Sequence, residues 1–314
     1  MKQADPVREW LREGDPAIRW HVTGSARERA KIAREGWGSR LLALQADDGM
    51  WGGGLYTPKW ISTTYTLLLL KAIGLAGGNR KAARGARLLL DNGLYRDGGI
   101  NFWTRWRNRS ETCVTAMALG IAARFLPNDA RLDALAGNLL AEQMPDGGWN
   151  CMRYRGATHS SVHTTISALE GLLEYEAAGG KSARKTAAAR ERAHEFLLAH
   201  RLFRSHRTGA VMDPRMTRFA FPPQWHYDVL RGLHYFAAAG VRPDERARDA
   251  VELVVRRRRP DGRWTRSHHW PGREHFPMEE KGAPSRWVTL QARRILAWWE
   301  GADPGARHGP ATPC

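Results

Sequence analysis

The sequence has few cysteines, no long apolar run and no leader-like start. It holds three cysteines, Cys113, Cys151 and Cys314, an odd number at no regular spacing, so we expect free thiols and no disulfide framework. Its longest purely aliphatic run, residues 67–70, is far shorter than the ~20 residues that span a bilayer. The first ten residues lack the apolar core of a signal peptide. We therefore expect a cytoplasmic protein.

Acidic residues are also few relative to basic ones, which leaves a formal net charge of +17 and a pI near 10.5. The dense basic run at residues 256–259 has no interleaved aromatics, and no recognised nucleic-acid motif is present. We expect no nucleic-acid partner. An anionic small ligand or a peripheral membrane contact accounts better for the charge.

What the sequence does contain is a repeat. Asp-Gly-x-Trp occurs at residues 48–51, 146–149 and 261–264, and a weaker copy, Asp-Gly-Gly-Ile, occupies 97–100. Trp51, Ile100 and Trp149 are each 49 residues apart. The gap between the last two strong copies leaves room for one more unit, whose motif has decayed around residues 202–209. The chain therefore has five units.

Each unit is expected to form a helix, a long loop and a second helix. The first helices are amphipathic and charged, at residues 26–45, 79–90, 130–143, 182–200 and 244–257. The second helices are more continuously apolar, at 63–75, 111–125, 161–175, 224–239 and 285–298. Alternating solvated and buried helices predict an all-α fold, a single closed α/α toroid over residues 26–300. Residues 1–25 should add a helical extension that helps close the ring, and 301–314 should form a disordered tail.

The inner helices of such a toroid all run in the same direction. Their first turns therefore meet at one end of the ring, which we call the mouth. Backbone N–H groups and the positive ends of the helix dipoles gather there and favour anions and thiolates. We expect the functional site at the mouth.

The segments Leu44-Gln-Ala-Asp-Asp-Gly-Met-Trp51 and Glu142-Gln-Met-Pro-Asp-Gly-Gly-Trp149 resemble the prenyltransferase/squalene-oxidase repeat family. This superfamily includes squalene–hopene cyclases, oxidosqualene cyclases and the β subunits of protein prenyltransferases. The resemblance covers about residues 26–299 and implies an α/α toroid that acts on an isoprenoid. The Asp-x-Asp-Asp acid of the squalene-type cyclases is absent.

The resemblance also implies a zinc site. Prenyltransferase β subunits carry Asp-x-Cys at one inner-helix start and His at the matching place of a later repeat; here Glu111 and Cys113 begin the second inner helix and His163 begins the third. Carboxylate, thiolate and imidazole are zinc ligands. His159 is the candidate for a fourth ligand, a supporting partner or an acid. Basic residues before the carboxylate contact the substrate diphosphate in the family, and the corresponding residues here are Arg105, Arg107 and Arg109.

A purely structural role is the alternative for each of the three predicted zinc ligands. Glu111 can complement the helix dipole, Cys113 can fill the core, and His163 can be a hydrogen-bonded core histidine.

A second candidate set begins the fourth inner helix. His226 and Asp228 can form an acid/base pair at the mouth, or they can belong to a capped polar first turn. Aromatic residues recur at inner-helix starts, where they either pack the ring or line an apolar substrate pocket, at Trp60, Trp225, Tyr227 and Trp287.

Three functions follow. The leading one is a zinc-dependent enzyme acting on an isoprenoid or similar apolar substrate. The alternatives are a metal-free terpenoid cyclase with Asp228 or Glu111 as acid, and a non-catalytic lipid- or peptide-binding toroid.

Overall fold

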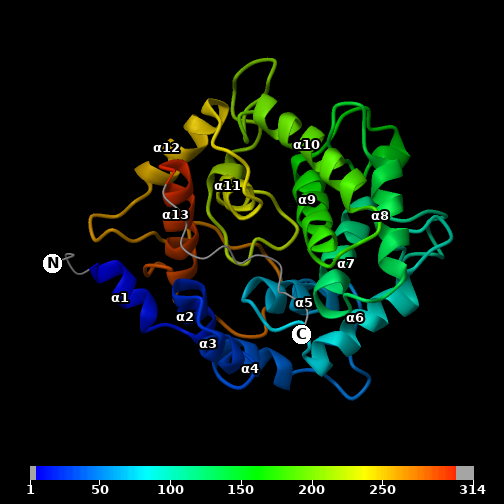
Figure 1. The fold of residues 1–314 in the computed structure, drawn as a ribbon, viewed down its shortest axis with the longest axis horizontal. Coiled ribbons are helices and arrows are strands. Elements are labelled where there is room, and N and C mark those ends of the chain that lie inside the picture. The colour runs from blue at the N-terminus through cyan, green and yellow to red at the C-terminus, as the bar shows by residue number, and fades with distance from the viewer. Residues whose placement is uncertain (1–4, 302–314) are drawn as a thin grey trace.

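The computed structural model describes residues 5–301, so the tail expected at 301–314 lies almost wholly outside the described residues. The described chain is a ring of helices in two layers (Figure 1). The inner layer consists of α5 (Thr63–Ala72), α7 (Thr112–Phe125), α9 (Val162–Ala177), α11 (Val229–Ala238) and α13 (Arg286–Trp299). The outer layer consists of α4 (Gly36–Ala43), α6 (Arg80–Gly93), α8 (Arg131–Glu142), α10 (Ala183–Ala199) and α12 (Arg248–Arg256). The expected all-α toroid is confirmed.

The N-terminal residues of the described chain complete the ring. They form α1 (Pro6–Arg12), α2 (Pro16–Thr23) and α3 (Ala26–Lys31), and α2 packs against both α3 and α13. Arg286 Nε donates to Trp10 O at 3.1 Å, and Arg294 Nη2 donates to His21 O at 2.6 Å. The first helices of the chain therefore lie on the last one.

The repeat motif makes the same hydrogen bonds in each unit that retains its tryptophan. The indole Nε1 donates to the carbonyl ten residues earlier, near the end of the outer helix, for Trp51, Trp149 and Trp264. The backbone N–H of the same tryptophan donates to a threonine hydroxyl in the following inner helix. All three indoles are at most 1% exposed. The motif thus fixes each outer helix to its inner partner.

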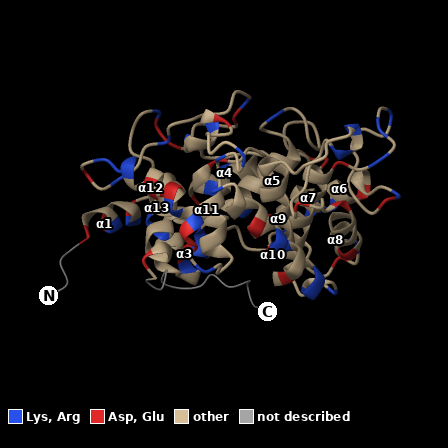
Figure 2. Ribbon diagram, turned by 90° about the horizontal axis from the view of Figure 1, so that it is seen from above, with Lys and Arg blue, Asp and Glu red and all other residues tan. Residues whose placement is uncertain are grey.

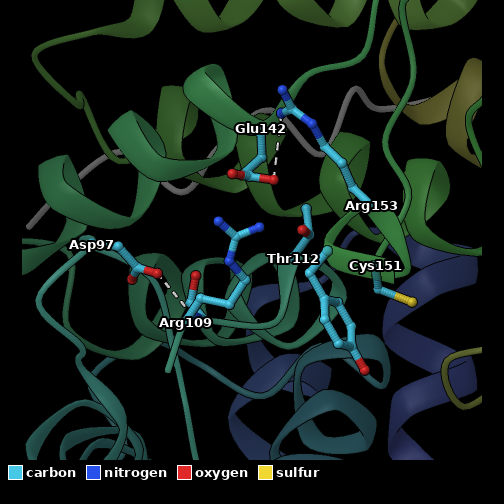
Figure 3. A pocket seen from close by; sticks show the side chains of 8 residues that line it. Asp97, Arg109, Thr112, Glu142, Cys151 and Arg153 are labelled. Carbon is cyan, nitrogen blue, oxygen red and sulfur yellow. Dashed lines mark hydrogen bonds and ion pairs between the residues drawn. The ribbon is translucent and has the colours of Figure 1, made fainter. Parts of the chain in front are cut away.

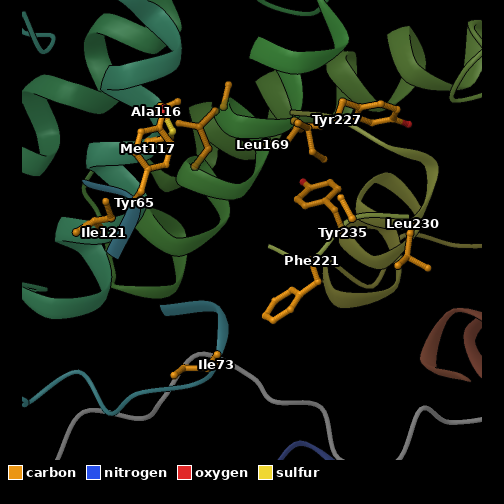
Figure 4. Close-up of a cluster of buried hydrophobic side chains, with 14 of the residues drawn as sticks. Tyr65, Ile73, Ala116, Met117, Ile121, Leu169, Phe221, Tyr227, Leu230 and Tyr235 are labelled. Atoms are coloured by element: carbon orange, nitrogen blue, oxygen red, sulfur yellow. The ribbon is translucent and has the colours of Figure 1, made fainter. Parts of the chain in front are cut away.

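The core lies between the helix layers and is densest where α7 meets α9. Figure 4 shows Ala116 and Met117 of α7 and Leu169 of α9 in one cluster of buried apolar side chains. A Cβ on Gly171 would lie 2.4 Å from Ala116 O, and a Cβ on Gly120 would lie 3.2 Å from Gly171 Cα. The two helices can approach this closely only because both positions are glycine.

Two expected helices differ from the structure. The helix expected over 26–45 is broken, because Gly36 has φ 63° and its place beside Asp15 leaves no room for a side chain. The helix expected over 224–239 begins only at Val229, since Gln224 has φ 57° and residues 224–228 form a loop whose last residue, Asp228, caps α11. The second difference moves four predicted site residues, Trp225, His226, Tyr227 and Asp228, from a helix into the loop before it.

The long loops between outer and inner helices gather along one edge of the ring (Figure 2). Lys and Arg are spread over many elements in the same view. Within the described residues, no helix is long and apolar enough to cross a membrane.

Candidate functional site

Two thiols and a carboxylate meet at the mouth, and we call them the thiol cluster. One ligand atom each from Glu111, Cys113 and Cys151 lies within 4.8 Å of the other two. Glu111 is the N-cap residue of α7 and Cys113 is the second residue of that helix. Cys151 belongs to the loop before α9, where its N–H donates to Thr164 Oγ1 at 3.2 Å. All three side chains are half-buried.

The two thiols differ in pKa. A hydrogen bond from Cys113 to Cys151 raises the pKa of Cys113 well above its ordinary value, and burial adds to the rise. The same bond lowers the pKa of Cys151 to about 7. Cys113 Sγ also lies 3.3 Å from Glu111 Oε1, which competes with Cys151 for the single Cys113 proton. Cys151 is therefore the thiol that ionises first, and thiolates are the nucleophilic and metal-binding form.

The three predicted arginines do not act as one set. Arg107 Nη1 pairs with Glu111 Oε2 at 2.5 Å, and its guanidinium lies over the rings of Trp103 and Tyr154. Arg105 is exposed. Arg109 faces a small pocket (Figure 3), which is lined by Asp97, Arg109, Ser110, Thr112, Glu142, Cys151, Arg153 and Tyr154.

His163 does not join the thiol cluster. It is the second residue of α9, as Cys113 is of α7, so the predicted equivalence of the two positions is correct. Its Nδ1, however, accepts the Tyr227 N–H at 2.8 Å in the loop before α11. Cys113 and His163 hold equivalent positions on neighbouring inner helices, and each side chain points toward the loop of the following unit. Cys113 therefore meets Cys151, which the motif comparison passed over.

His159 lies outside the cluster as well. It is exposed, and its Nδ1 is 3.2 Å from Thr158 Oγ1. Its carbonyl accepts from Asn150 Nδ2 at 2.8 Å, which helps to shape the loop.

The other side of the mouth is a stack of rings formed by Trp60, Trp225, His226 and Trp270, which we call the aromatic cluster. The His226 ring lies 3.8 Å from Trp225 and 3.3 Å from Trp270, centroid to centroid, nearly parallel to both. Trp60 meets it edge-on at 5.7 Å. Burial lowers the pKa of His226 to about 3 and that of His163 to about 4, so both imidazoles are neutral near pH 7.

Asp228 serves as a helix cap. Its Oδ1 accepts the Arg231 N–H at 2.8 Å, and its Oδ2 accepts the Ala220 N–H at 3.1 Å. It is 2% exposed, and burial raises its pKa to about 6. The geometry matches the capped first turn that the sequence left open beside the acid/base pair.

Tyr227 and Trp287 are buried. The hydroxyl of Tyr227 has no partner among the described residues, and burial raises its pKa. Trp287 stacks on Phe221 with the ring centroids 4.4 Å apart. Both side chains pack the ring beside the aromatic cluster.

Sequence reasoning ranked Cys151 below His159 as a further zinc ligand, and it did not consider Lys59 or Trp270. A signal existed for Cys151, because it follows Trp149 by two residues and lies in the loop of the unit next to Cys113. No comparable signal marks Lys59, whose place depends on the path of a long loop.

No protein-family model matches this sequence, and no curated protein matches it. Among solved structures, a protein from Actinoplanes is similar with TM-score 0.49 and 18% identity, covering 94% of this chain and 88% of that one. A glycosyl hydrolase family 88 protein from Bacteroides vulgatus has TM-score 0.49 and 11% identity, with 94% and 90% covered. The type II terpene cyclase MstE from Scytonema has TM-score 0.35 and 14% identity, with 86% and 97% covered. These similarities are too distant to indicate an activity.

Proposed function

We propose that this chain is an enzyme that acts on an isoprenoid or similarly apolar substrate at the mouth of the toroid, and that it depends on zinc. The observation that carries the proposal is the thiol cluster. Two thiols and a carboxylate with all ligand atoms within 4.8 Å of one another form a donor set typical of zinc.

The donor set fits the ion in type and spacing. Tetrahedral zinc with Zn–S of ~2.3 Å has ligand atoms about 3.8 Å apart, so Glu111, Cys113 and Cys151 need only small rotations. Loss of the Cys113 proton would free Glu111 Oε1, while Arg107 keeps its contact with Oε2. Three protein ligands leave a fourth position open, as in catalytic sites. Bound zinc would supply an activated nucleophile there or hold a leaving group.

The surroundings favour a substrate with an anionic head and an apolar body. Arg109 and Arg153 line the pocket beside Cys151, and the first turn of α7 opens toward the same place. Guanidinium groups and a helix N-terminus both suit a diphosphate. Aromatic rings on the other side of the mouth offer apolar contacts.

Metal content tests the proposal directly. Protein purified without chelator should carry about one zinc per chain, measured by mass spectrometry of the metal. Cys113→Ala and Cys151→Ala should each lose it, because two donors are too few for a stable site. His163→Ala is the matched control and should retain it. A metal-free preparation that zinc cannot reload, or loss of zinc only from His163→Ala, would overturn the assignment.

Substrate class is tested separately. An isoprenoid diphosphate such as geranyl diphosphate should bind the wild type, and Arg109→Gln should weaken that binding about tenfold through loss of one charged contact. Arg105→Gln is the control, since Arg105 does not line the pocket that Arg109 lines. Equal weakening by both variants would indicate general charge attraction, and no binding at all would remove this substrate class.

One observation favours the metal-free cyclase as a second candidate, namely the raised pKa of Asp228. Both of its oxygens accept backbone N–H groups, so an acid role would compete with the cap. Turnover of an isoprenoid substrate in zinc-free protein would favour this candidate. Binding without turnover in zinc-loaded protein would favour the lipid- or peptide-binding toroid.

A further inference from the structure

Lys59 lies between the thiol cluster and the aromatic cluster at the mouth. Its Nζ lies 5.3 Å from the ring centroid of Tyr56, 5.4 Å from that of Trp60 and 5.5 Å from that of Trp225. The side chain is half-buried. Three aromatic rings therefore surround one primary amine at the place where a substrate would enter.

The backbone fixes this position. Trp60 N–H donates to Arg273 O and Arg273 N–H donates to Lys59 O, both at 3.0 Å, so loops of the first and fifth units pair across the mouth. Trp60 Nε1 also donates to Pro271 O at 3.0 Å. The amine is held in place without any contact of its own to a carboxylate.

Within residues 5–301, Lys59 Nζ makes neither an ion pair nor a hydrogen bond. Lys71, in contrast, pairs with Glu174 at 3.3 Å. An ammonium that is partly removed from water without a counter-charge is destabilised relative to the neutral amine. Burial accordingly lowers the pKa of Lys59, and the carboxylate of Glu111 opposes part of that shift. A desolvated lysine in an aromatic pocket is a nucleophile.

We propose that Lys59 captures the carbonyl group of an apolar aldehyde or ketone at the mouth as a Schiff base. The lone pair of the neutral amine forms a bond to the carbonyl carbon as the C=O π bond breaks. Both N–H protons of the amine then pass to the oxygen, the remaining C–O bond breaks as the C=N bond forms, and the oxygen leaves as water. The product is an imine, whose protonated form is a cation. The faces of Tyr56, Trp60 and Trp225 suit that cation. The step requires no metal, and it shares with the proposed function only the apolar character of the ligand.

Reductive trapping tests the proposal on the full chain. Citral, an apolar ten-carbon aldehyde, would be added at pH 7 with cyanoborohydride, which reduces an imine to a stable amine. Peptide mapping should then show Lys59 modified at least about tenfold more than any other of the eight lysines. Lys59→Arg keeps the charge and the stem but forms no imine, so it should abolish the preference. Lys71→Arg is the matched control and should leave the modification of Lys59 unchanged.

Several results would overturn the proposal. Even modification of all the lysines would show that Lys59 is an ordinary surface amine. Equal trapping of glyceraldehyde, a polar aldehyde, would show that the aromatic rings around Lys59 give no preference for an apolar aldehyde. The melting temperature of Lys59→Arg serves as a control. If it is close to that of the wild type, loss of the trapped product reflects loss of the amine and not unfolding. Zinc content measured on the same samples keeps the two proposals apart, because chelated protein should still be trapped at Lys59.

Discussion

The two halves of the mouth both lie where loops meet the starts of inner helices, and they behave differently. In the thiol cluster, half-buried side chains have titrating or charged partners, such as Arg107 on Glu111 and Cys113 on Cys151. In the aromatic cluster, the titratable His226 is stacked between indoles and kept neutral. The thiol cluster makes the Cys151 thiol reactive near neutral pH, whereas the aromatic cluster keeps the His226 imidazole uncharged.

The difference arises from side chains and not from the fold. Cys113, His163 and Trp287 are each the second residue of an inner helix, and each meets a different loop. The helices supply equivalent positions, and the loops decide what those positions contact. A toroid can therefore hold reactive chemistry on one side and packing on the other.

The largest effect should come from removing the neutral imidazole. The unfolded His226 has a pKa near 6.5 and the folded one about 3, so the unfolded state binds the extra proton as the pH falls. Stability should therefore decrease from pH 6.5 toward pH 3. His226→Phe keeps a ring between the indoles and should be more stable than the wild type by roughly 2–3 kcal/mol at pH 4. Urea unfolding at pH 4 and pH 7 measures this; His159→Phe, at an exposed site, should show no such gain.

Next in size is the reactivity of Cys151. The hydrogen bond from Cys113 holds its pKa near 7, so iodoacetamide should modify Cys151 before Cys113 at neutral pH. Cys113→Ala removes the donor and should slow alkylation of Cys151 at pH 7 on the order of tenfold. Peptide mapping over time measures both rates. Faster alkylation in the variant would show that Cys113 shields Cys151 and does not activate it.

A smaller effect is expected for the cap of α11. Asp228→Asn keeps one acceptor for two backbone N–H groups and should cost about 1–2 kcal/mol. The raised pKa means that the wild type itself loses stability as the pH rises from about 4 through 6, so the cost should be larger near pH 4 than above pH 6. Thermal melts across this range test the sign. Normal melting combined with lost activity would instead assign Asp228 to catalysis.

The smallest effect should be that of His159→Ala. The side chain is exposed and its one ring contact is to the adjacent Thr158. We expect a change within about 0.5 kcal/mol and unchanged zinc content. A loss of zinc from this variant would show that the loop rearranges to bring His159 to the metal.

The sequence predicted the ring well because the ring depends on periodic features. The 49-residue spacing and the alternation of charged and apolar helices placed the helix pairs, and the motif tryptophans are buried in all three strong copies. The two errors, at Gly36 and Gln224, involve left-handed backbone conformations, which no apolar pattern records.

The site was predicted only in part. Glu111 and Cys113 begin α7 as expected, since a helix start is a local feature. Their partner was mistaken because the direction of a side chain toward a neighbouring loop is not local. Lys59 and Trp270 come from long loops of the first and fifth units, whose pairing depends on ring closure and cannot be derived from either segment alone.

Docking of α2 on α13 has a consequence for how the molecule comes apart. An open stack of repeats can fray, because its last unit has only one neighbour and unfolds at little expense to the others. A closed ring has no such unit, so unfolding any one unit breaks two interfaces at once. Denaturation should then be a single concerted event, with the enthalpy from calorimetry equal to the one from the width of the transition.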